Sequence, residues 1–243
     1  MSMESLPDGY RAAVFGASGG IGGAFVDLLV QDPRCAVVHA GSRGPASPTN
    51  GKVAPFAFDL TDTDSIAHAA EQIGDVDMVI VATGILHGDG LLPEKTVRAI
   101  DPAAMAQVLA INAIGPALIA RHLLPRMSRE RRTLFAALSA KVGSISDNQL
   151  GGWYSYRASK AALNQLVRTL AVEVSRTHPR CVCVALHPGT VDTPLSRPFQ
   201  TGVAAGRLFS PQRAAQQLLS VLDGLGPDSS GRLIGWDGHE ISP

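Results

Sequence analysis

The sequence contains only three cysteines, which excludes a framework of disulfide bonds as the basis of the fold. Cys35, Cys181 and Cys183 are odd in number, and the spacing of the last two matches neither a redox pair nor a zinc site. We expect all three to be small, buried apolar side chains. The seven histidines lack the helical spacing of paired metal ligands and have no cysteine partners, so no metal site is predicted.

An excess of charge is also missing. The 21 Lys and Arg residues balance 21 Asp and Glu residues, which argues against nucleic acid or an anionic membrane as a partner. No uninterrupted apolar run approaches the roughly 20 residues that cross a bilayer. Residues 1–11 lack the basic start and apolar stretch of a secretion signal. We therefore expect a cytoplasmic protein that binds a small molecule.

Short apolar segments alternate with amphipathic ones along the chain. The apolar segments predict strands over residues 11–15, 36–40, 54–58, 78–82, 133–138, 180–186 and 231–234. The amphipathic segments predict helices over residues 21–31, 61 or 62 to 73, 102–127, 154–177 and 211–222. This alternation indicates an α/β fold with a doubly wound parallel sheet of about seven strands, in a single domain over residues 1–243. Residues 188–209, rich in Pro, Gly, Ser and Thr, predict a loop of the kind that covers a site.

A glycine-rich turn joins the first predicted strand to the first predicted helix. Glycines let the backbone approach a pyrophosphate closely, and the amino end of the helix offers unpaired N–H groups and a positive dipole end. We assign cofactor binding to Gly16, Ser18, Gly20, Ile21 and Gly22. The alternative for this turn is a flexible connection between strand and helix.

The end of the second predicted strand indicates which dinucleotide is bound. An acidic residue there holds a free ribose hydroxyl, whereas an arginine accepts a 2′-phosphate. The sequence has Ser42 and Arg43 and no acid at this place, about 20 residues beyond the last glycine of the turn. NADP(H) is therefore predicted in preference to NAD(H). The alternative for Arg43 is a solvated loop arginine.

Ser139, Tyr156 and Lys160 form a candidate catalytic set. Tyr156 and Lys160 are four residues apart and therefore lie on one helical face. A nearby ammonium group is expected to lower the tyrosine pKa toward the range in which the phenol exchanges a proton at neutral pH. Tyr154 lacks such a partner, because Ala158 follows it at the same spacing. Taken alone, a pair at this spacing is more often an ordinary helix surface than a catalytic dyad.

The motifs occur in a fixed order over nearly the whole chain: the glycine turn at 16–22, Ser139, the run YRASK at 156–160 and the run HPGTVDT at 187–193. In these features the sequence resembles the short-chain dehydrogenase/reductase family. The segments 112–116, 142–148, 151–156 and 236–238 resemble more narrowly its C-factor-like subgroup, which is named after a bacterial cell–cell signalling protein.

The resemblance implies a role for each member of a catalytic tetrad. Tyr156 would be the proton donor, and Lys160 would bind the nicotinamide ribose and depress the tyrosine pKa. Ser139 would hydrogen-bond the substrate oxygen. Asn112, at a local irregularity of its helix, would hold a water next to Lys160. The alternatives are a satisfied buried amide for Asn112 and a strand-end cap for Ser139.

The resemblance also implies cofactor contacts from three further segments. These contacts come from Asp59, Leu60, Ala82, Thr83, Gly84, Pro188, Gly189, Val191 and Thr193. Asp59 can equally belong to a helix-capping turn, and the segment after Pro188 to an ordinary turn. The sequence departs from the family at two places: Phe15 replaces a threonine, and Val81-Ala82-Thr83-Gly84 replaces Asn-Asn-Ala-Gly. The second change removes a side-chain amide near the adenosine.

We therefore expect an NADP(H)-dependent oxidoreductase that interconverts a carbonyl and an alcohol on a small, mostly neutral substrate. The alternative is a dinucleotide-binding signalling or regulatory protein of C-factor type, with little or no turnover. The predicted substrate wall includes Val142, Ser144, Leu150, Trp153 and part of residues 193–209, and its mixture of apolar and small polar groups suits an uncharged molecule. His87 is expected to be an ordinary loop histidine.

The resemblance further suggests a homodimer or homotetramer that packs through two long helices, over residues 105–127 and 154–177. Both helices carry apolar residues on more than one face. A helix covered on both sides within one monomer would show the same pattern.

Overall fold

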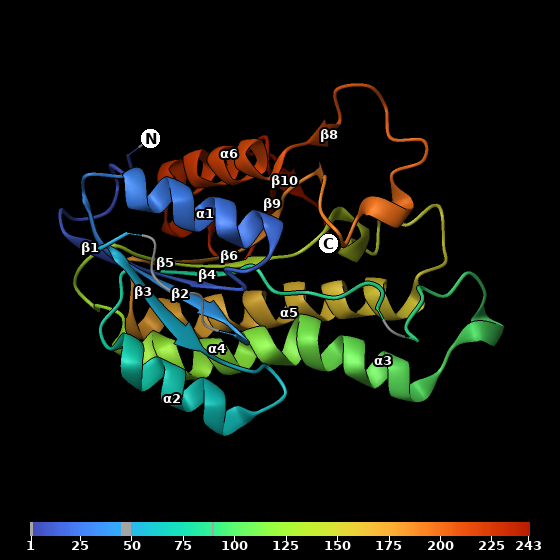
Figure 1. Ribbon diagram of the computed structural model, residues 1–243, viewed down its shortest axis with the longest axis horizontal. Helices are drawn as coiled ribbons and strands as arrows, with labels where there is room; N and C mark the ends of the chain where they lie inside the picture. The colour runs from blue at the N-terminus through green and yellow to red at the C-terminus, as the bar shows by residue number, and fades with distance from the viewer. Residues whose placement is uncertain (1, 45–49, 89) are drawn as a thin grey trace.

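One sheet forms the centre of the molecule. The computed structural model describes residues 2–44, 50–88 and 90–243. Its strands are β1 (Tyr10–Phe15), β2 (Cys35–Ser42), β3 (Val53–Ala57), β4 (Met78–Val81), β5 (Thr133–Leu138), β6 (Cys181–His187), β9 (Leu233–Gly235) and β10 (Glu240–Ile241). They lie in the order β10-β9-β6-β5-β4-β1-β2-β3 (Figure 1). Every pair is parallel except β10 with β9, so the predicted α/β fold with a largely parallel sheet is confirmed.

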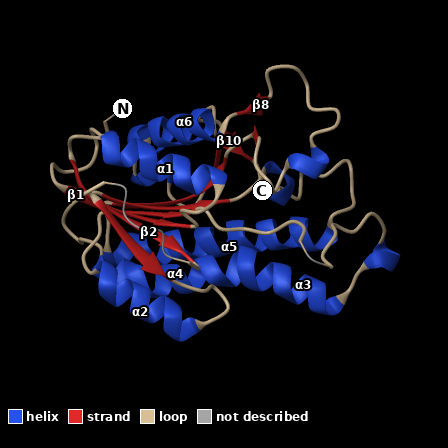
Figure 2. Cartoon of the chain, in the orientation of Figure 1, coloured by secondary structure: helices blue, strands red, loops and turns tan. Residues whose placement is uncertain are grey.

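Helices cover both faces of this sheet (Figure 2). They are α1 (Gly20–Gln31), α2 (Thr63–Ile73), α3 (Pro102–Leu109), α4 (Gly115–Leu123), α5 (Tyr154–Thr177) and α6 (Pro211–Gly224). In Figure 1, α1 and α6 lie above the sheet, whereas α2, α4 and α5 lie below it. Because helices flank both faces, the central strands are buried on both sides and therefore read as continuous apolar runs.

Alternate residues of each strand belong to different hydrophobic cores, because successive side chains of a strand point to opposite faces of the sheet. On β6, Cys181 and Cys183 join the core under α2, α4 and α5. Val182 and Val184 join the core under α1 and α6. All three cysteines are free and buried, as predicted.

Side-chain caps fix the beginnings of three helices. Asp62, Asp101 and Ser210 each accept a hydrogen bond from a backbone N–H in the first turn of α2, α3 and α6. The structure also contains β10 and a separate pair, β7 (Thr190–Val191) with β8 (Leu208–Phe209), which the sequence did not predict. Each of these strands has two residues and is too short to show the two-residue period of a strand.

The helix predicted over residues 102–127 is interrupted. A π-helical turn, Ala110–Ile114, separates α3 from α4, and a 3₁₀ turn ends the segment at Arg126. The segment Pro102–Arg126 is long and apolar enough to cross a membrane by length and composition alone, a test that core helices of soluble proteins also pass. In this fold α3 packs against α5, and α4 packs against α2 and α5.

A buried carboxylate ties the amino-terminal segment to the sheet. Asp32 is 1% exposed and accepts hydrogen bonds from the backbone of Met3 and Arg34 and from the Tyr10 hydroxyl. Burial alone would raise the pKa of Asp32, but the hydrogen bonds outweigh it and hold the pKa below its ordinary value of 3.8. The ionised Asp32 carboxylate therefore stabilises the fold at pH values above about 3.8. This stabilisation is lost as the pH falls through the lowered pKa of Asp32 in the folded protein.

We expect Asp32→Ala to lower the free energy of unfolding at pH 7 by about 1–3 kcal/mol, because buried donors lose their acceptor. Denaturant titration at pH 7 measures the loss, and the difference from the wild type should shrink at acid pH. Asp8→Ala is the matched control, since Asp8 is 87% exposed in its ion pair with Arg34 and such pairs contribute little. Equal losses in the two variants would contradict the assignment.

Candidate active site

Ser139, Tyr156 and Lys160 meet where β5 ends against α5. Ser139 follows β5 directly, and the Lys160 Nζ donates a 2.8 Å hydrogen bond to the carbonyl oxygen of Leu138, the last residue of that strand. The same Nζ lies 5.8 Å from the centre of the Tyr156 ring. Ser139, Tyr156 and Lys160 are 4%, 9% and 3% exposed, whereas Tyr154 is 38% exposed. The structure thus buries the predicted set and leaves the second tyrosine of the helix outside it.

Burial dominates the acid–base properties of this pair. It raises the pKa of Tyr156 to about 12 and lowers the pKa of Lys160 to about 8. The pKa of Tyr156 is thus raised overall, contrary to the expected lowering. The physical reason is that both groups lose hydration, while the ammonium group hydrogen-bonds Leu138 rather than the phenol.

Asn112 lies in the π-helical turn, which confirms the expected irregularity of its helix. Its Oδ1 accepts from the Ile85 N–H, and its Nδ2 donates to the Ile85 carbonyl and to the Ser159 hydroxyl, at 2.8, 2.8 and 3.0 Å. A Cβ atom on Gly84 would lie 3.4 Å from the Asn112 Oδ1 and 3.6 Å from the Lys160 Nζ. Asn112 is thus a satisfied buried amide that borders, with Lys160, a space left open by a glycine. Its relay role stays a prediction.

The glycine turn leads into an uncapped helix. The cap residue of α1, Gly19, has no side chain, and the first turn of α1 contains no acidic residue. The backbone N–H groups there are suited to an anion such as a pyrophosphate. A Cβ atom on Gly20 would lie 2.9 Å from the Thr193 methyl group, so the turn touches the loop that follows β6. Ser18 is exposed, and Ile21 is partly buried at the start of α1.

The end of β4 closes the other side of this turn. A Cβ atom on Gly16 would lie 3.0 Å from the backbone of Ala82 and 3.1 Å from the Thr83 methyl group, and Gly22 packs closely on the Gly16 carbonyl. The Thr83 Oγ1 is buried and has no hydrogen-bond partner among the described residues. A glycine-lined turn, an uncapped helix and an orphaned hydroxyl together fit a bound dinucleotide. Phe15, which stands in place of the family's threonine, packs its ring edge-on against Phe56 and Phe58.

The residues after β2 and β3 lie near one another. Ser42 is buried and donates to the Gly44 carbonyl at 2.6 Å, while Arg43 is exposed. The Asp59 Oδ1 accepts from the backbone N–H and the hydroxyl of Thr61, which lowers the pKa of Asp59, with a smaller contribution from the charge of Arg43. Asp59 therefore forms the turn before α2, and Asp62 is the cap.

The side chains of Leu60 and Val191 face the protein interior. Leu60 would collide with a Cβ atom on Gly115, and Val191 is 4% exposed in a small core with Phe209. Each predicted cofactor contact from these two residues would thus have to come from the backbone. Gly189 has a φ of +76°, and a Cβ atom there would lie 2.7 Å from the Phe209 ring, so only glycine fits this turn. Pro188, beside it, is buried.

Aromatic rings link Tyr156 to the loop over residues 193–209. The Trp153 ring lies 6.1 Å from the Tyr156 ring and 4.9 Å from the Phe199 ring, between centroids. His87 contacts Phe199 at 5.6 Å, and its Nε2 lies 3.1 Å from the Pro194 carbonyl oxygen. His87 is thus attached to the loop rather than free in solution. Leu150, expected in the substrate wall, is 92% exposed.

Glu94 is a residue of the site region that the sequence did not reveal. Its carboxylate is 6% exposed and accepts hydrogen bonds from the backbone N–H and the hydroxyl of Ser155, in the first turn of α5. Its carbonyl oxygen accepts from the N–H of Trp153, a non-glycine residue with a φ of 53°. Glu94 thereby caps the helix that carries Tyr156 and Lys160. The two partners are 61 residues apart, so no local pattern could have predicted the contact.

Known proteins share this sequence pattern. The family described as short chain dehydrogenase matches residues 11–203. C-signal of Myxococcus xanthus is 36% identical over 142 residues, which cover 58% of this chain and 80% of C-signal. The 1-hydroxy-2-glutathionyl-2-methyl-3-butene dehydrogenase of Rhodococcus sp. (strain AD45) is 28% identical over 180 residues, 74% of this chain and 76% of that protein.

Solved structures share the fold. The NADPH-bound carbonyl reductase from chicken fatty liver superposes with a TM-score of 0.84 at 26% identity, over 99% of this chain and 96% of that one. The carbonyl reductase Sniffer of D. melanogaster superposes with a TM-score of 0.82 at 20% identity, over 97% and 99% of the two chains. Since the family match covers well over half of the chain, the protein belongs to the short-chain dehydrogenase/reductase family of oxidoreductases.

Proposed function

We propose that this protein is an NADP(H)-dependent oxidoreductase that interconverts a carbonyl and an alcohol on a small, mostly neutral substrate. One observation carries the proposal: a tyrosine and a lysine are buried on one face of α5, against the strand end that bears Ser139. Arg43 beyond the end of β2 supports the choice of NADP(H), as does the NADPH in the similar carbonyl reductase from chicken.

The bound nicotinamide would supply a hydride to the carbonyl carbon, and the protein supplies the matching proton. Tyr156 keeps its proton at neutral pH, because burial raises its pKa to about 12, so it can donate that proton to the substrate oxygen. The tyrosinate left behind would be stabilised by the ammonium group of Lys160. In the resting protein Lys160 hydrogen-bonds Leu138, which keeps the charge buried beside the phenol.

The aromatic wall supports an uncharged substrate. The Trp153 ring contacts the Tyr156 ring on one side and, on the other, the ring of Phe199 from the loop over residues 193–209. Such surfaces bind apolar parts of a molecule, while a few polar groups fix its orientation. We infer that the substrate places its carbonyl at Tyr156 and an apolar group against these rings.

The test is turnover on a panel of ketones, aldehydes and quinones, followed by the absorbance of the reduced nicotinamide. The proposal expects substrate-dependent oxidation of NADPH that is faster than oxidation of NADH. Binding of neither nucleotide would overturn it.

The rate of reduction should fall as the pH rises through about 8. Carbonyl reduction needs Tyr156 protonated and Lys160 charged, and of the two groups Lys160 loses its proton first, at a pKa of about 8. Accordingly kcat/KM for reduction should be constant below about pH 7 and fall nearly tenfold per pH unit well above 8. Tyr154→Phe is the matched control and should leave the profile unchanged. A rate that stays constant up to pH 10 would contradict the role of Lys160.

The second candidate function is regulatory. The similarity to C-signal of Myxococcus xanthus, at 36% identity, favours it. In that case the protein would bind a dinucleotide tightly but reduce none of the ketones, aldehydes and quinones of the panel. Tyr156→Phe would leave its regulatory function intact. Nucleotide titration together with the turnover panel separates the two candidates.

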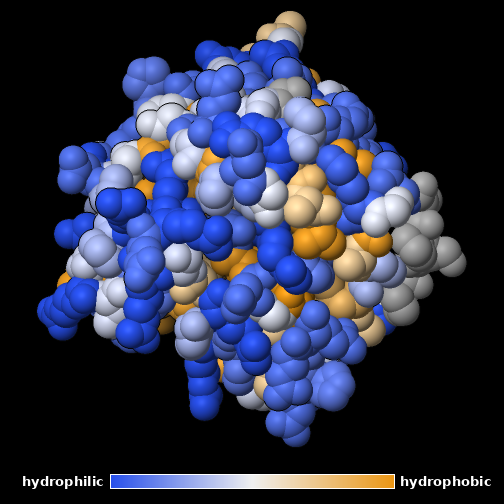
Figure 3. Space-filling view, turned by 90° about the vertical axis from the view of Figure 1, so that its left-hand side faces the viewer, coloured by the Kyte–Doolittle hydropathy of each residue, from blue (hydrophilic) through white to orange (hydrophobic). Residues whose placement is uncertain are grey.

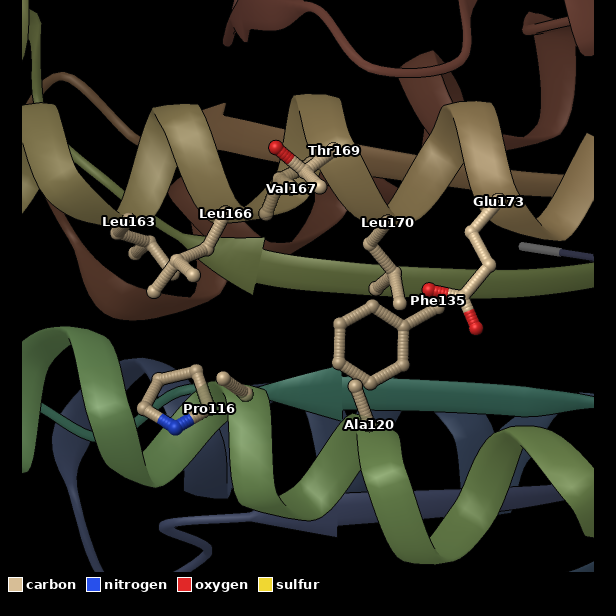
Figure 4. Close-up of a pocket in the computed structure, with 10 residues that line it drawn as sticks. Pro116, Ala120, Phe135, Leu163, Leu166, Val167, Thr169, Leu170 and Glu173 are labelled. Carbon is tan, nitrogen blue, oxygen red and sulfur yellow. The ribbon is translucent and has the colours of Figure 1, made fainter.

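A second copy of this chain is the partner that we propose for the groove between α4 and α5 (Figure 4). The cavity there, of about 170 Å³, is lined by Pro116, Ala117, Ala120, Phe135, Leu163, Leu166, Val167, Thr169, Leu170 and Glu173. Leu166 and Val172 on α5 are 38% and 44% exposed. On the side at the left of Figure 1, by contrast, hydrophobic residues reach the surface in small groups among hydrophilic ones (Figure 3).

We expect Leu166→Arg to convert the wild-type dimer or tetramer to a monomer, because it places a charge in an apolar contact. Light scattering coupled to size-exclusion chromatography measures the mass. Leu92→Arg is the control, since Leu92 is 78% exposed and lies outside the groove. A monomeric wild-type protein would refute the interface.

A further inference from the structure

The hydroxyl hydrogen of Ser139 already has a partner inside the protein. The Ser139 Oγ donates a 2.6 Å hydrogen bond to the Oδ1 of Asn164. A serine hydroxyl has a single hydrogen to donate. While that bond exists, Ser139 can only accept hydrogen bonds from other groups, and a carbonyl oxygen has no hydrogen to offer.

Asn164 lies on the catalytic helix at a fixed spacing from the other groups. It is one turn beyond Lys160 and two turns beyond Tyr156, so the three residues share one face of α5. Its Nδ2 is buried and has no hydrogen-bond partner among the described residues. An unpaired buried amide donor is costly, and an arrangement in which Nδ2 donates to a partner would remove that cost.

Asn164 also borders a cavity. It lines this cavity of about 510 Å³ together with residues of α5, β9 and β10. The charged side chains that line this cavity are those of Arg168 of α5, Arg232 and Glu240, and the last two form an ion pair at 2.7 Å. Lys160, one turn before Asn164 on α5, hydrogen-bonds Leu138.

We propose that Asn164 is a positioning residue that serves Ser139 in both hydrogen-bond directions. In the resting protein its Oδ1 accepts the Ser139 hydrogen. When the Ser139 hydroxyl donates its hydrogen bond to a carbonyl substrate instead, the Asn164 amide group rotates and its Nδ2 donates a hydrogen bond to the Ser139 Oγ. Ser139 thereby keeps its position while its O–H bond points at the substrate oxygen. The inference rests on the proposed reductase function.

The kinetic test compares Asn164→Asp, Asn164→Leu and wild type. A carboxylate accepts but cannot donate, so both variants should lower kcat by about tenfold at pH 8, the size expected for loss of one hydrogen bond, with a smaller change in KM. Asn164→Asp should regain activity as the pH falls and its carboxyl group takes up a proton, because a carboxylic acid again offers one donor and one acceptor. Asn164→Leu should show no such recovery.

Two comparisons separate this role from a general loss of structure. In a Ser139→Ala background, Asn164→Leu should have no further effect, since it acts through Ser139. Gln165→Leu is the matched control, because Gln165 is exposed and its side chain hydrogen-bonds only Thr169 among the described residues. NADPH binding should be the same in all variants, and thermal denaturation should show that each variant is folded at the assay temperature. Wild-type activity of Asn164→Asp at pH 8, or additive losses in the double variant, would overturn the proposal.

Neutron diffraction of the cofactor-free protein tests the resting state without any turnover. We expect the Ser139 hydrogen on the line to the Asn164 Oδ1. An Nδ2 that faces the Ser139 Oγ in this state would overturn the proposal even if the protein proves to be a reductase. A hydrogen found as expected, in a protein that turns over no carbonyl, would instead mark failure of the proposed function alone.

Discussion

Tyr156→Phe should lower kcat/KM for carbonyl reduction by about 10²–10⁴-fold, the range that general acid catalysis contributes. The variant removes one oxygen from a side chain that is 9% exposed and keeps the ring that packs against Trp153 at 6.1 Å. The fold and the nucleotide site should therefore persist. Steady-state kinetics gives the loss in rate, and fluorescence titration with NADPH should give a dissociation constant close to the wild-type value.

Tyr154→Phe is the matched control for this substitution. Tyr154 is two residues away on the same helix but 38% exposed, so the same chemical change should leave kcat/KM within about twofold of the wild type, as for most surface substitutions. Retention of more than a tenth of the activity by Tyr156→Phe would show that another group donates the proton. Loss of NADPH binding by Tyr156→Phe would show that the fall in rate comes from lost cofactor binding rather than from a missing proton donor.

Arg43→Leu should weaken NADPH binding by about tenfold or more and leave NADH binding nearly unchanged. A guanidinium group binds a phosphate through two charge-assisted hydrogen bonds, and hydrogen bonds to charged groups contribute about 1.5–3 kcal/mol. Arg43 is exposed in the resting protein, so screening by solvent places the effect at the lower end of this range. Titration of both nucleotides at two salt concentrations measures the preference, and the loss should be smaller at high salt.

Arg98→Leu serves as the control for a general charge effect. Arg98 is exposed in a 3₁₀ turn, far along the chain from β2. Removing its charge should change the affinities for NADPH and NADH by the same small factor. If Arg43→Leu also lowers both affinities equally, Arg43 does not select the 2′-phosphate and the preference for NADP(H) is wrong.

Much of the fold could be predicted because it depends on local patterns. The strands of a doubly wound sheet are buried on both faces, so β4, and β5 after its first residue Thr133, appear in the sequence as apolar runs. Asp62 and Asp101 mark helix starts by the same local rule, since a short polar side chain satisfies the free N–H groups of the first turn. β10 was missed because two residues at the edge of a sheet carry no such pattern.

The pKa of Tyr156 shows the limit of reasoning from spacing. A separation of four residues placed Lys160 on the same helical face, and the charge was expected to lower the tyrosine pKa. The outcome depends on how deeply both groups are buried and on where the ammonium group finds its acceptor. In the folded protein the acceptor is the Leu138 carbonyl at 2.8 Å, and desolvation raises the pKa of Tyr156 to about 12.

By itself the sequence determined the α/β architecture, the glycine turn before α1 and the family to which the chain belongs, because these depend on residue types at short, regular spacing. Only the tertiary structure decided which side chains meet. Glu94 hydrogen-bonds Ser155, which is 61 residues away in the sequence. Asn164 accepts a hydrogen bond from Ser139, 25 residues away, and the Phe199 ring contacts the Trp153 ring. Contacts between distant segments depend on how helices and strands pack in three dimensions, and no local pattern along the chain encodes that packing.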